Sequence, residues 1–155
     1  MLQYLDDFLL VCRSQAEVLA AGQFAIGLCS RLGIAINFPK SDFVPTQRRE
    51  HLGVVVNTKL GMFELSVGRL SKLRASAAAL LATVCGSRRW VPKRRLAEFA
   101  GLAQSCSLAV PGTRFHLMAV YDSISSESGW SAGVRVRVSK ECVHDLRWWL
   151  QLPRA

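Results

Sequence analysis

The sequence lacks the features of several protein classes. Its 155 residues include five cysteines, an odd number, at wide spacings and without a C-x-x-C pair. The three histidines do not stand at zinc-finger spacing from these cysteines. We therefore expect neither a disulfide scaffold nor a zinc finger, and a reducing compartment, the cytosol or the nucleus, is favoured. Since no apolar run is long enough to span a bilayer, we expect no membrane partner.

Acidic residues are also scarce. The chain carries 20 Lys and Arg against 11 Asp and Glu, which gives a net charge of +9. The stretch between Leu65 and Ala97 holds no acidic residue and these basic ones: Arg69, Lys72, Arg74, Arg88, Arg89, Lys93, Arg94 and Arg95. A solvated helix face usually mixes both signs, so a segment of one sign indicates a grip on a phosphate backbone. A basic surface without a nucleic-acid partner is the alternative.

Hydrophobic periodicity predicts an α+β fold. Residues 2–12 are expected to form two short strands that meet at Asp6-Asp7, followed by a helix that Ser14 caps and Gly33 ends. A strand over 34–37 and a hairpin over 51–65 are expected next. Spacings of three and four then predict helices over 70–84, 92–106 and 115–121. An edge strand over 134–138 and a final helix capped by Ser139 complete the chain.

Two adjacent aspartates, Asp6 and Asp7, lie in the apolar segment QYLDDFLLV (3–11). Carboxylates are costly to place among apolar strands unless a cation compensates their charge. A pair at a rigid bend can hold Mg²⁺, which keeps its other positions for waters and substrate phosphates. Two such ions can activate a 3′-hydroxyl and stabilise a leaving pyrophosphate. The alternative is an ordinary solvated turn.

Several motifs, taken in order, resemble those of reverse transcriptases. YLDD (4–7) resembles their Y-x-D-D catalytic turn, LGIAINFPKSDF (32–43) the strand and Lys-containing loop that follow, and HLGVVV (51–56) the hairpin that grips the primer. The segments 69–84 and 91–118 resemble the helical thumb, and VSKECVHDLRWWLQL (138–152) the segment that leads to a ribonuclease H domain. The thumb is most similar to that of DIRS-like, tyrosine-recombinase retrotransposons.

The resemblance implies a domain order and an activity. A partial palm of antiparallel hairpins plus a helix would span 1–65, an all-helical thumb 66–128, and a tether toward a ribonuclease H domain 129–155. The implied reaction is magnesium-dependent, template-directed DNA synthesis, with an RNA or DNA template-primer and a dNTP as substrates. We expect a two-metal site.

The resemblance also implies roles for single residues. Asp6 and Asp7 would hold the metal ions, and Tyr4 would lie near the primer terminus and the incoming nucleotide. Lys40 would neutralise or protonate the leaving pyrophosphate. The primer grip would include Leu52 and Gly53.

Simpler structural roles stay open for most of these positions. Tyr4 can be an ordinary strand aromatic, Lys40 a solvated loop lysine, and Gly53 a residue that only shapes a tight hairpin. Stacking on bases and packing in the core are both open for the tryptophans Trp90, Trp130, Trp148 and Trp149, with the core favoured for Trp149.

The metal site of the resembled family also needs an aspartate from a strand upstream of the Y-x-D-D turn, and the sequence before Tyr4 does not contain one. We therefore expect a fragment that has no polymerase activity alone. The alternative is a non-catalytic, basic helical module that binds nucleic acid, with an affinity that falls steeply with salt and is indifferent to Asp6→Ala. The sequence does not indicate an oligomeric state.

Overall fold

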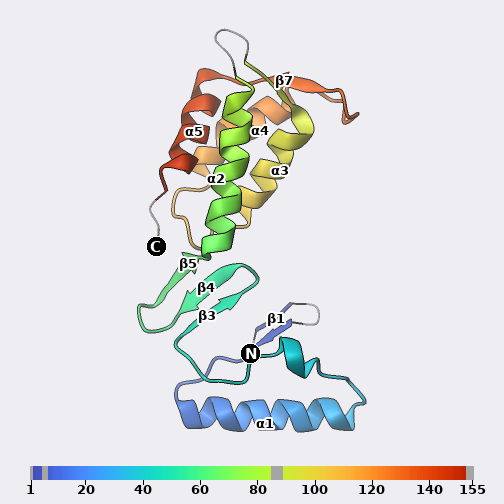
Figure 1. Ribbon diagram of the computed structural model, residues 1–155, viewed down its shortest axis with the longest axis vertical. Helices are drawn as coiled ribbons and strands as arrows, with labels where there is room; N and C mark the ends of the chain where they lie inside the picture. The colour runs from blue at the N-terminus through green and yellow to red at the C-terminus, as the bar shows by residue number, and fades with distance from the viewer. Residues whose placement is uncertain (1, 5–6, 85–88, 153–155) are drawn as a thin grey trace. The chain divides into compact units, whose positions relative to one another are not determined.

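The structure, a computed structural model, describes residues 2–4, 7–84 and 89–152 (Figure 1). The fold is mixed α+β, with α-helices and small antiparallel sheets, as the sequence predicts. The chain divides into two compact units, residues 1–49 (unit 1) and 50–155 (unit 2). The boundary falls within strand β3 (Arg48–His51). In the described ranges, no helix has the length and apolar character needed to cross a membrane.

Unit 1 begins with a short hairpin. Strand β1 (Leu2–Tyr4) pairs antiparallel with β2 (Asp7–Leu9), and the register places Tyr4 opposite Asp7. Residues 5 and 6, which connect the strands in sequence, lie outside the described residues. The two predicted strands are confirmed, but Asp7 pairs as the first residue of β2 and is not part of the bend.

Helix α1 (Gln15–Arg31) follows, with the predicted caps at both ends. The Ser14 hydroxyl accepts a hydrogen bond from the Glu17 N–H (3.2 Å), as an N-cap residue does. The helix ends at Gly33, whose φ of +71° suits glycine, and the N–H of Ile34 donates to the Cys29 carbonyl (2.9 Å). That bond closes a Schellman motif and satisfies an end carbonyl of the helix.

The strand predicted over residues 34–37 does not form, so that prediction is wrong. The backbone groups there are used locally: the Ile34 N–H closes α1, and the Asn37 carbonyl accepts from the Lys40 N–H (3.0 Å). Residues 38–40 form the short 3₁₀ helix η1 (Phe38–Lys40) instead. A strand needs these groups for a ladder with a neighbour, and here they are already paired.

Unit 2 begins with a three-stranded sheet in the order β3-β4-β5. Strands β4 (Val54–Asn57) and β5 (Met62–Leu65) pair antiparallel, which confirms the predicted hairpin. The turn between β3 and β4 consists of Leu52 and Gly53, with φ of +53° and +79°. Positive φ at both positions is what a two-residue type I′ hairpin turn requires.

The helices of unit 2 enclose one hydrophobic core (Figure 1). They are α2 (Val67–Ala82), α3 (Lys93–Gln104), η2 (Phe115–Leu117), α4 (Met118–Ser125) and α5 (Lys140–Leu150). Fully buried side chains from α2, α3 and α5 meet there, and Phe99 packs edge-to-face against Trp149 at 6.0 Å between ring centroids. The core position favoured for Trp149 is confirmed.

Two short strands, one of them not predicted, close the core of unit 2. Strand β6 (Trp90–Pro92) pairs antiparallel with β7 (Arg135–Arg137), the predicted edge strand. Val136 of β7 and Leu146 of α5 are fully buried in the same core as α2 and α3. The assignment of 129–155 as a tether stays a prediction, and residues of this segment belong to the core of unit 2.

Candidate nucleic-acid interface

The hairpin of unit 1 carries the aspartate pair at the end where its strands are connected. Tyr4 pairs with Asp7 in the ladder, and only Leu5 and Asp6 separate them in sequence, the shortest connection of an antiparallel pair. Asp7 is exposed, whereas Asp6 lies outside the described residues. The described backbone therefore places Tyr4 and Asp7 opposite each other at the end of the ladder.

A complete metal site is not visible in the described ranges. They contain no group of three or more His, Cys, Asp or Glu side chains close enough to hold a metal ion. The donor chemistry of the pair nevertheless suits Mg²⁺, because this ion is held by one or two carboxylates together with waters and substrate phosphates. The exposed Asp7 fits that pattern, with Asp6 as its neighbour in sequence.

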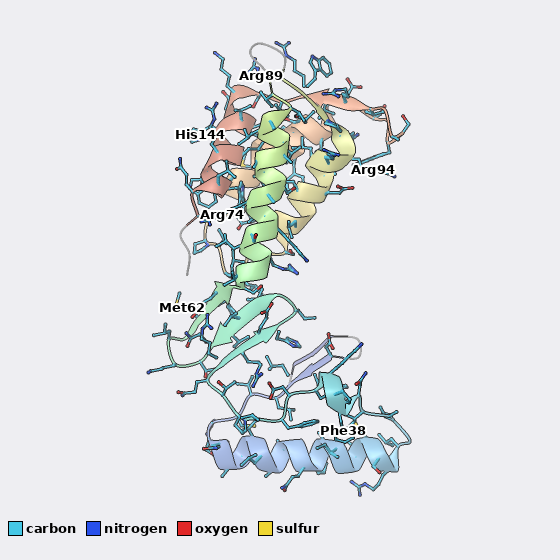
Figure 2. The ribbon with its side chains drawn as sticks, viewed as in Figure 1. Phe38, Met62, Arg74, Arg89, Arg94 and His144 are labelled. Carbon is cyan, nitrogen blue, oxygen red and sulfur yellow. The ribbon has the colours of Figure 1, made fainter. Side chains whose placement is uncertain are left out.

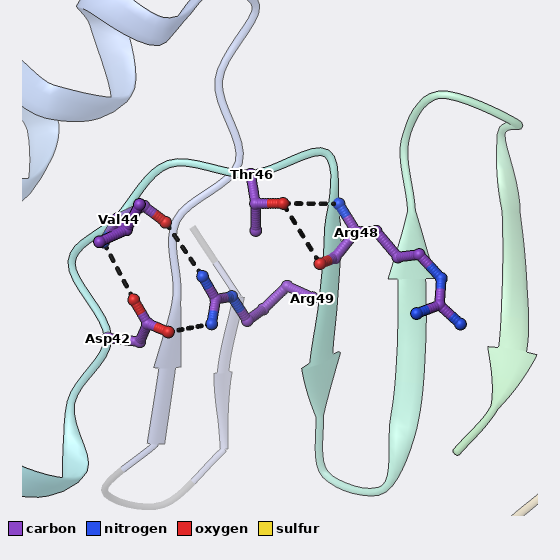
Figure 3. Close-up of polar contacts among 5 residues, drawn as sticks. All are labelled: Asp42, Val44, Thr46, Arg48 and Arg49. Atoms are coloured by element: carbon purple, nitrogen blue, oxygen red, sulfur yellow. Dashed lines mark hydrogen bonds and ion pairs between the residues drawn. The ribbon is translucent and has the colours of Figure 1, made fainter. Parts of the chain in front are cut away.

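Lys40 is exposed at the end of η1, and the loop that follows it is held by a polar network (Figure 3). Asp42 accepts from the Val44 N–H (3.0 Å) and forms an ion pair with Arg49, which also donates to the Val44 carbonyl (3.0 Å). The Val44 N–H, and then Arg49, hold the pKa of Asp42 below its usual value. Sequence reasoning missed this network; its only local signal is the Asx-turn spacing of Asp42 and Val44.

The Leu52-Gly53 turn is held by a residue of the basic segment. The guanidinium of Arg69 lies against Gly53, with its Cζ 2.7 Å from where a Cβ would stand. Arg69 Nη1 donates to the Ser105 hydroxyl (2.6 Å) at the end of α3. Gly53 is therefore required both by its positive φ and by the close approach of Arg69.

The predicted phosphate contacts divide into two groups. Lys72, Arg94 and Arg95 are exposed, and Arg89 is half-buried. Figure 2 labels Arg74, Arg89 and Arg94 on the helical body of unit 2. Arg88 lies outside the described residues. Lys72, Arg94, Arg95 and, in part, Arg89 therefore have side-chain surface that a phosphate backbone could contact.

Arg74 and Lys93 make internal contacts instead, as does Arg69 with Ser105. Arg74 donates to the Leu152 carbonyl, which ties α2 to the end of α5. Lys93 is only 3% exposed; its ammonium donates to the Glu127 carbonyl and lies 4.2 Å from the centre of the Trp130 ring. Arg69, Arg74 and Lys93 therefore brace unit 2, and the proposed phosphate contacts do not include them.

The sequence assigns no role to the histidines, and in the structure His116 makes contacts within unit 2. His116 Nδ1 lies 2.9 Å from an Asp145 carboxylate oxygen, and its ring stacks on Trp148 with centroids 3.7 Å apart. The Trp149 indole N–H donates to the His116 carbonyl (3.1 Å). These contacts join η2 to α5 and belong to the packing of unit 2.

The chain was compared with protein-family models, with curated proteins and with solved structures, and none of them matches.

Proposed function

We propose that this chain is the palm–thumb part of a reverse-transcriptase-like polymerase, in which unit 2 binds nucleic acid and the β1–β2 hairpin carries the metal-binding pair. The observation that carries the proposal is the register of that hairpin, with Tyr4 opposite Asp7. It gives the YLDD motif the local backbone pairing that its proposed role needs. The net charge of +9 supports a polyanionic substrate.

In the proposed reaction, Asp6 and Asp7 would hold Mg²⁺, whose charge stabilises phosphate oxygens during nucleotidyl transfer. The ammonium of Lys40, exposed after η1, would stabilise the charge that develops on the leaving pyrophosphate. Lys72, Arg94 and Arg95 would contact the phosphate backbone of the template-primer. Leu52 and Gly53 would contact the primer strand at a turn held by Arg69.

We expect the purified chain alone to show no nucleotide incorporation. Among the described residues, no three His, Cys, Asp or Glu side chains lie close enough together to hold a metal ion, and the proposed reaction needs two bound ions. Unit 1 also lacks a buried core among its described residues, so its apolar side chains need cover from another surface before the hairpin can hold a precise site.

A chimaera tests the proposal. A reverse-transcriptase palm segment that ends a strand in aspartate is placed before Met1, and primer extension on an RNA template is measured with Mg²⁺. We expect extension that Asp6→Asn and Asp7→Asn abolish. Asp122→Asn is the control, because Asp122 is an exposed aspartate of unit 2 to which the proposed reaction gives no role, and it should retain activity. A folded chimaera that binds template-primer without extending it, or that extends it equally well with Asp6→Asn, contradicts the proposal.

The second candidate function is a non-catalytic nucleic-acid-binding module. It is favoured by one observation: unit 2 holds both the hydrophobic core and the basic segment, whereas the aspartate pair belongs to unit 1. Binding could then be independent of the pair. An inactive chimaera whose affinity for RNA is unchanged by Asp6→Asn and falls steeply with salt would favour this candidate.

A further inference from the structure

The β6–β7 ribbon has one buried face and one exposed face. Val91 pairs with Val136, and both side chains are fully buried in the core of unit 2. Side chains alternate along a strand, so the flanking pairs face outward. These are Trp90 opposite Arg137 and Pro92 opposite Arg135. Exposure agrees: the Trp90 side chain is 44% exposed, and both arginines are exposed.

A second exposed indole, Trp130, is held by the side chain of Lys93. Lys93 directly follows β6, and its N–H donates to the Val134 carbonyl (3.0 Å) just before β7. Its buried ammonium lies 4.2 Å from the centre of the Trp130 ring, a cation–π distance. Trp130 is nevertheless 57% exposed, so the ring is held by the cation while much of its surface faces solvent.

We propose that Trp90, Trp130, Arg135 and Arg137, the ribbon surface, bind single-stranded nucleic acid. This inference rests on the proposed function, in which unit 2 binds nucleic acid, and it names the form of the ligand and the residues that read it. Bases stack on the two indoles, and phosphates pair with the two arginines. Basic grooves with aromatic platforms are the usual construction of single-strand sites.

Duplex nucleic acid fits this surface less well. In a duplex, base faces are stacked on each other and only base edges are exposed in the grooves, so an indole has no face to stack on. In a single strand, every base offers a face to an exposed ring. Stacking tolerates any base, so a surface of two indoles and two arginines is expected to bind single strands with little sequence preference.

The two arginines are not equivalent. Arg135 uses Nη2 to donate to the Trp90 carbonyl (2.8 Å), which leaves most of its five guanidinium N–H donors free. Arg137 also lines an open hollow of about 570 Å³ that contains Asp122, Glu141 and Asp145. Those carboxylates disfavour a phosphate there, so Arg135 is the stronger contact.

The test measures binding of the full chain to fluorescein-labelled dT15 by anisotropy at several salt concentrations. Trp90→Ala with Trp130→Ala removes two stacking platforms and is expected to weaken binding by about 30-fold or more. Intrinsic tryptophan fluorescence should be quenched by dT15 in the parent chain and not in the double variant. Tyr121→Ala, another exposed aromatic of unit 2, is the matched control and should keep the parent affinity.

The arginine arm uses Arg135→Gln and Arg137→Gln. Removing one phosphate-binding cation from a single-strand complex makes the slope of log K against log salt shallower by about 0.7, and the larger change is expected for Arg135→Gln. Arg135→Gln loses the bond to the Trp90 carbonyl and Trp130→Ala loses the contact with Lys93, so a modest fall in melting temperature is expected for these two. Circular dichroism at the temperature of the binding assay checks that every variant is folded when its affinity is measured.

The outcomes separate this inference from the proposed function. If dT15 binds and the double tryptophan variant keeps both affinity and quenching, the assignment of the ribbon surface as the binding site is wrong. The proposal that unit 2 binds nucleic acid would then still stand. Equal or tighter binding of a 15-base-pair duplex without quenching also overturns the assignment of the ribbon surface. If the parent chain binds neither dT15, single-stranded RNA nor a primed template, then this inference and the proposed function both fail.

Discussion

The two units differ in how much apolar surface they bury. In unit 1, no described side chain is buried, and helix α1 buries none of its apolar residues. In unit 2, the helices α2 to α5 and the strands β6 and β7 share one core. Both units are rich in apolar residues, so composition does not separate them. What separates them is whether another element of the same unit covers the apolar face.

The uncovered apolar face of unit 1 bears on function. Most of a helix's stability in a protein comes from tertiary packing, and α1 of unit 1 has little of it. The exposed apolar residues of this unit include Phe24, Leu28, Leu32, Ile34, Phe38 and Phe43. The unit that carries the aspartate pair is thus expected to be the less stable one, and the unit that carries the basic segment the more stable one.

The largest expected difference between the two units is the loss of stability when one phenylalanine in each is changed to alanine. Phe99 is fully buried in unit 2, and Phe24 is 64% exposed in unit 1. Phe99→Ala should lower the free energy of unfolding by about 3–5 kcal/mol, because it leaves a cavity. Phe24→Ala should change it by less than about 0.5 kcal/mol. Urea unfolding followed by circular dichroism measures both, and equal losses would mean that α1 is buried.

Thiol reactivity gives the next largest contrast. Cys12 of unit 1 is exposed, whereas Cys142 of unit 2 is buried, and desolvation raises the pKa of its thiol to about 11. The thiolate is the reactive form, so Cys142 should be alkylated at pH 8 by iodoacetamide far more slowly than Cys12. Peptide mass spectrometry over time measures both rates. Equal rates in the native chain, rather than only in urea, would contradict the assignment of a closed core.

Glycine substitutions test whether the close packing of unit 2 extends to its sheet. Gly53→Ala introduces strain at φ +79° and displaces the Arg69 guanidinium from Ser105. Gly61→Ala is the matched control, with φ +63° and open space around the added Cβ. We expect Gly53→Ala to cost about 1 kcal/mol more than Gly61→Ala, the usual contribution of one hydrogen bond.

A double-mutant cycle isolates that contact. In an Arg69→Ala background, Gly53→Ala and Gly61→Ala should have equal effects on the melting temperature, since only backbone strain is left in both. A difference that persists without Arg69 would mean that another neighbour, not Arg69, restricts Gly53.

The smallest expected effect concerns pH in unit 1. The Val44 N–H and Arg49 lower the pKa of Asp42 in the folded chain. A lowered pKa stabilises the loop above the unfolded pKa of about 3.9, and this stabilisation is lost as pH falls through the lower, folded pKa. Exchange of the Val44 amide proton should therefore be slowed at pH 6 and lose that protection in acid. Asp42→Asn, which removes the charge, should show no such pH dependence.

Some elements follow directly from local sequence. Ser14 and Ser139 each accept a hydrogen bond from the N–H three residues later, as their position before a helix predicts. Turn residues and apolar spacing likewise predict the hairpin of β4 and β5 and the end of α1 at Gly33. These signals act over a few residues, so a single sequence contains them.

Other features of the fold cannot be predicted from neighbouring residues in the sequence. Residues 34–37 have the composition of a strand and no neighbour to pair with, because their backbone groups close α1 and η1. Local sequence does not predict strand β6, because its partner β7 lies more than 40 residues away. Lys93 has the sequence context of a phosphate contact, and its burial beneath Trp130 depends on a loop far along the chain.

The sequence by itself determined the helix caps, the hairpins, the basic segment and the position of the aspartate pair, because each depends on neighbours in the chain. Only the tertiary structure decided which cations are free and which brace the fold, and which apolar faces are covered. Those outcomes depend on contacts between distant segments. The bond from Arg74 of α2 to the Leu152 carbonyl and the pairing of Trp90 with Arg137 are examples that no local pattern contains.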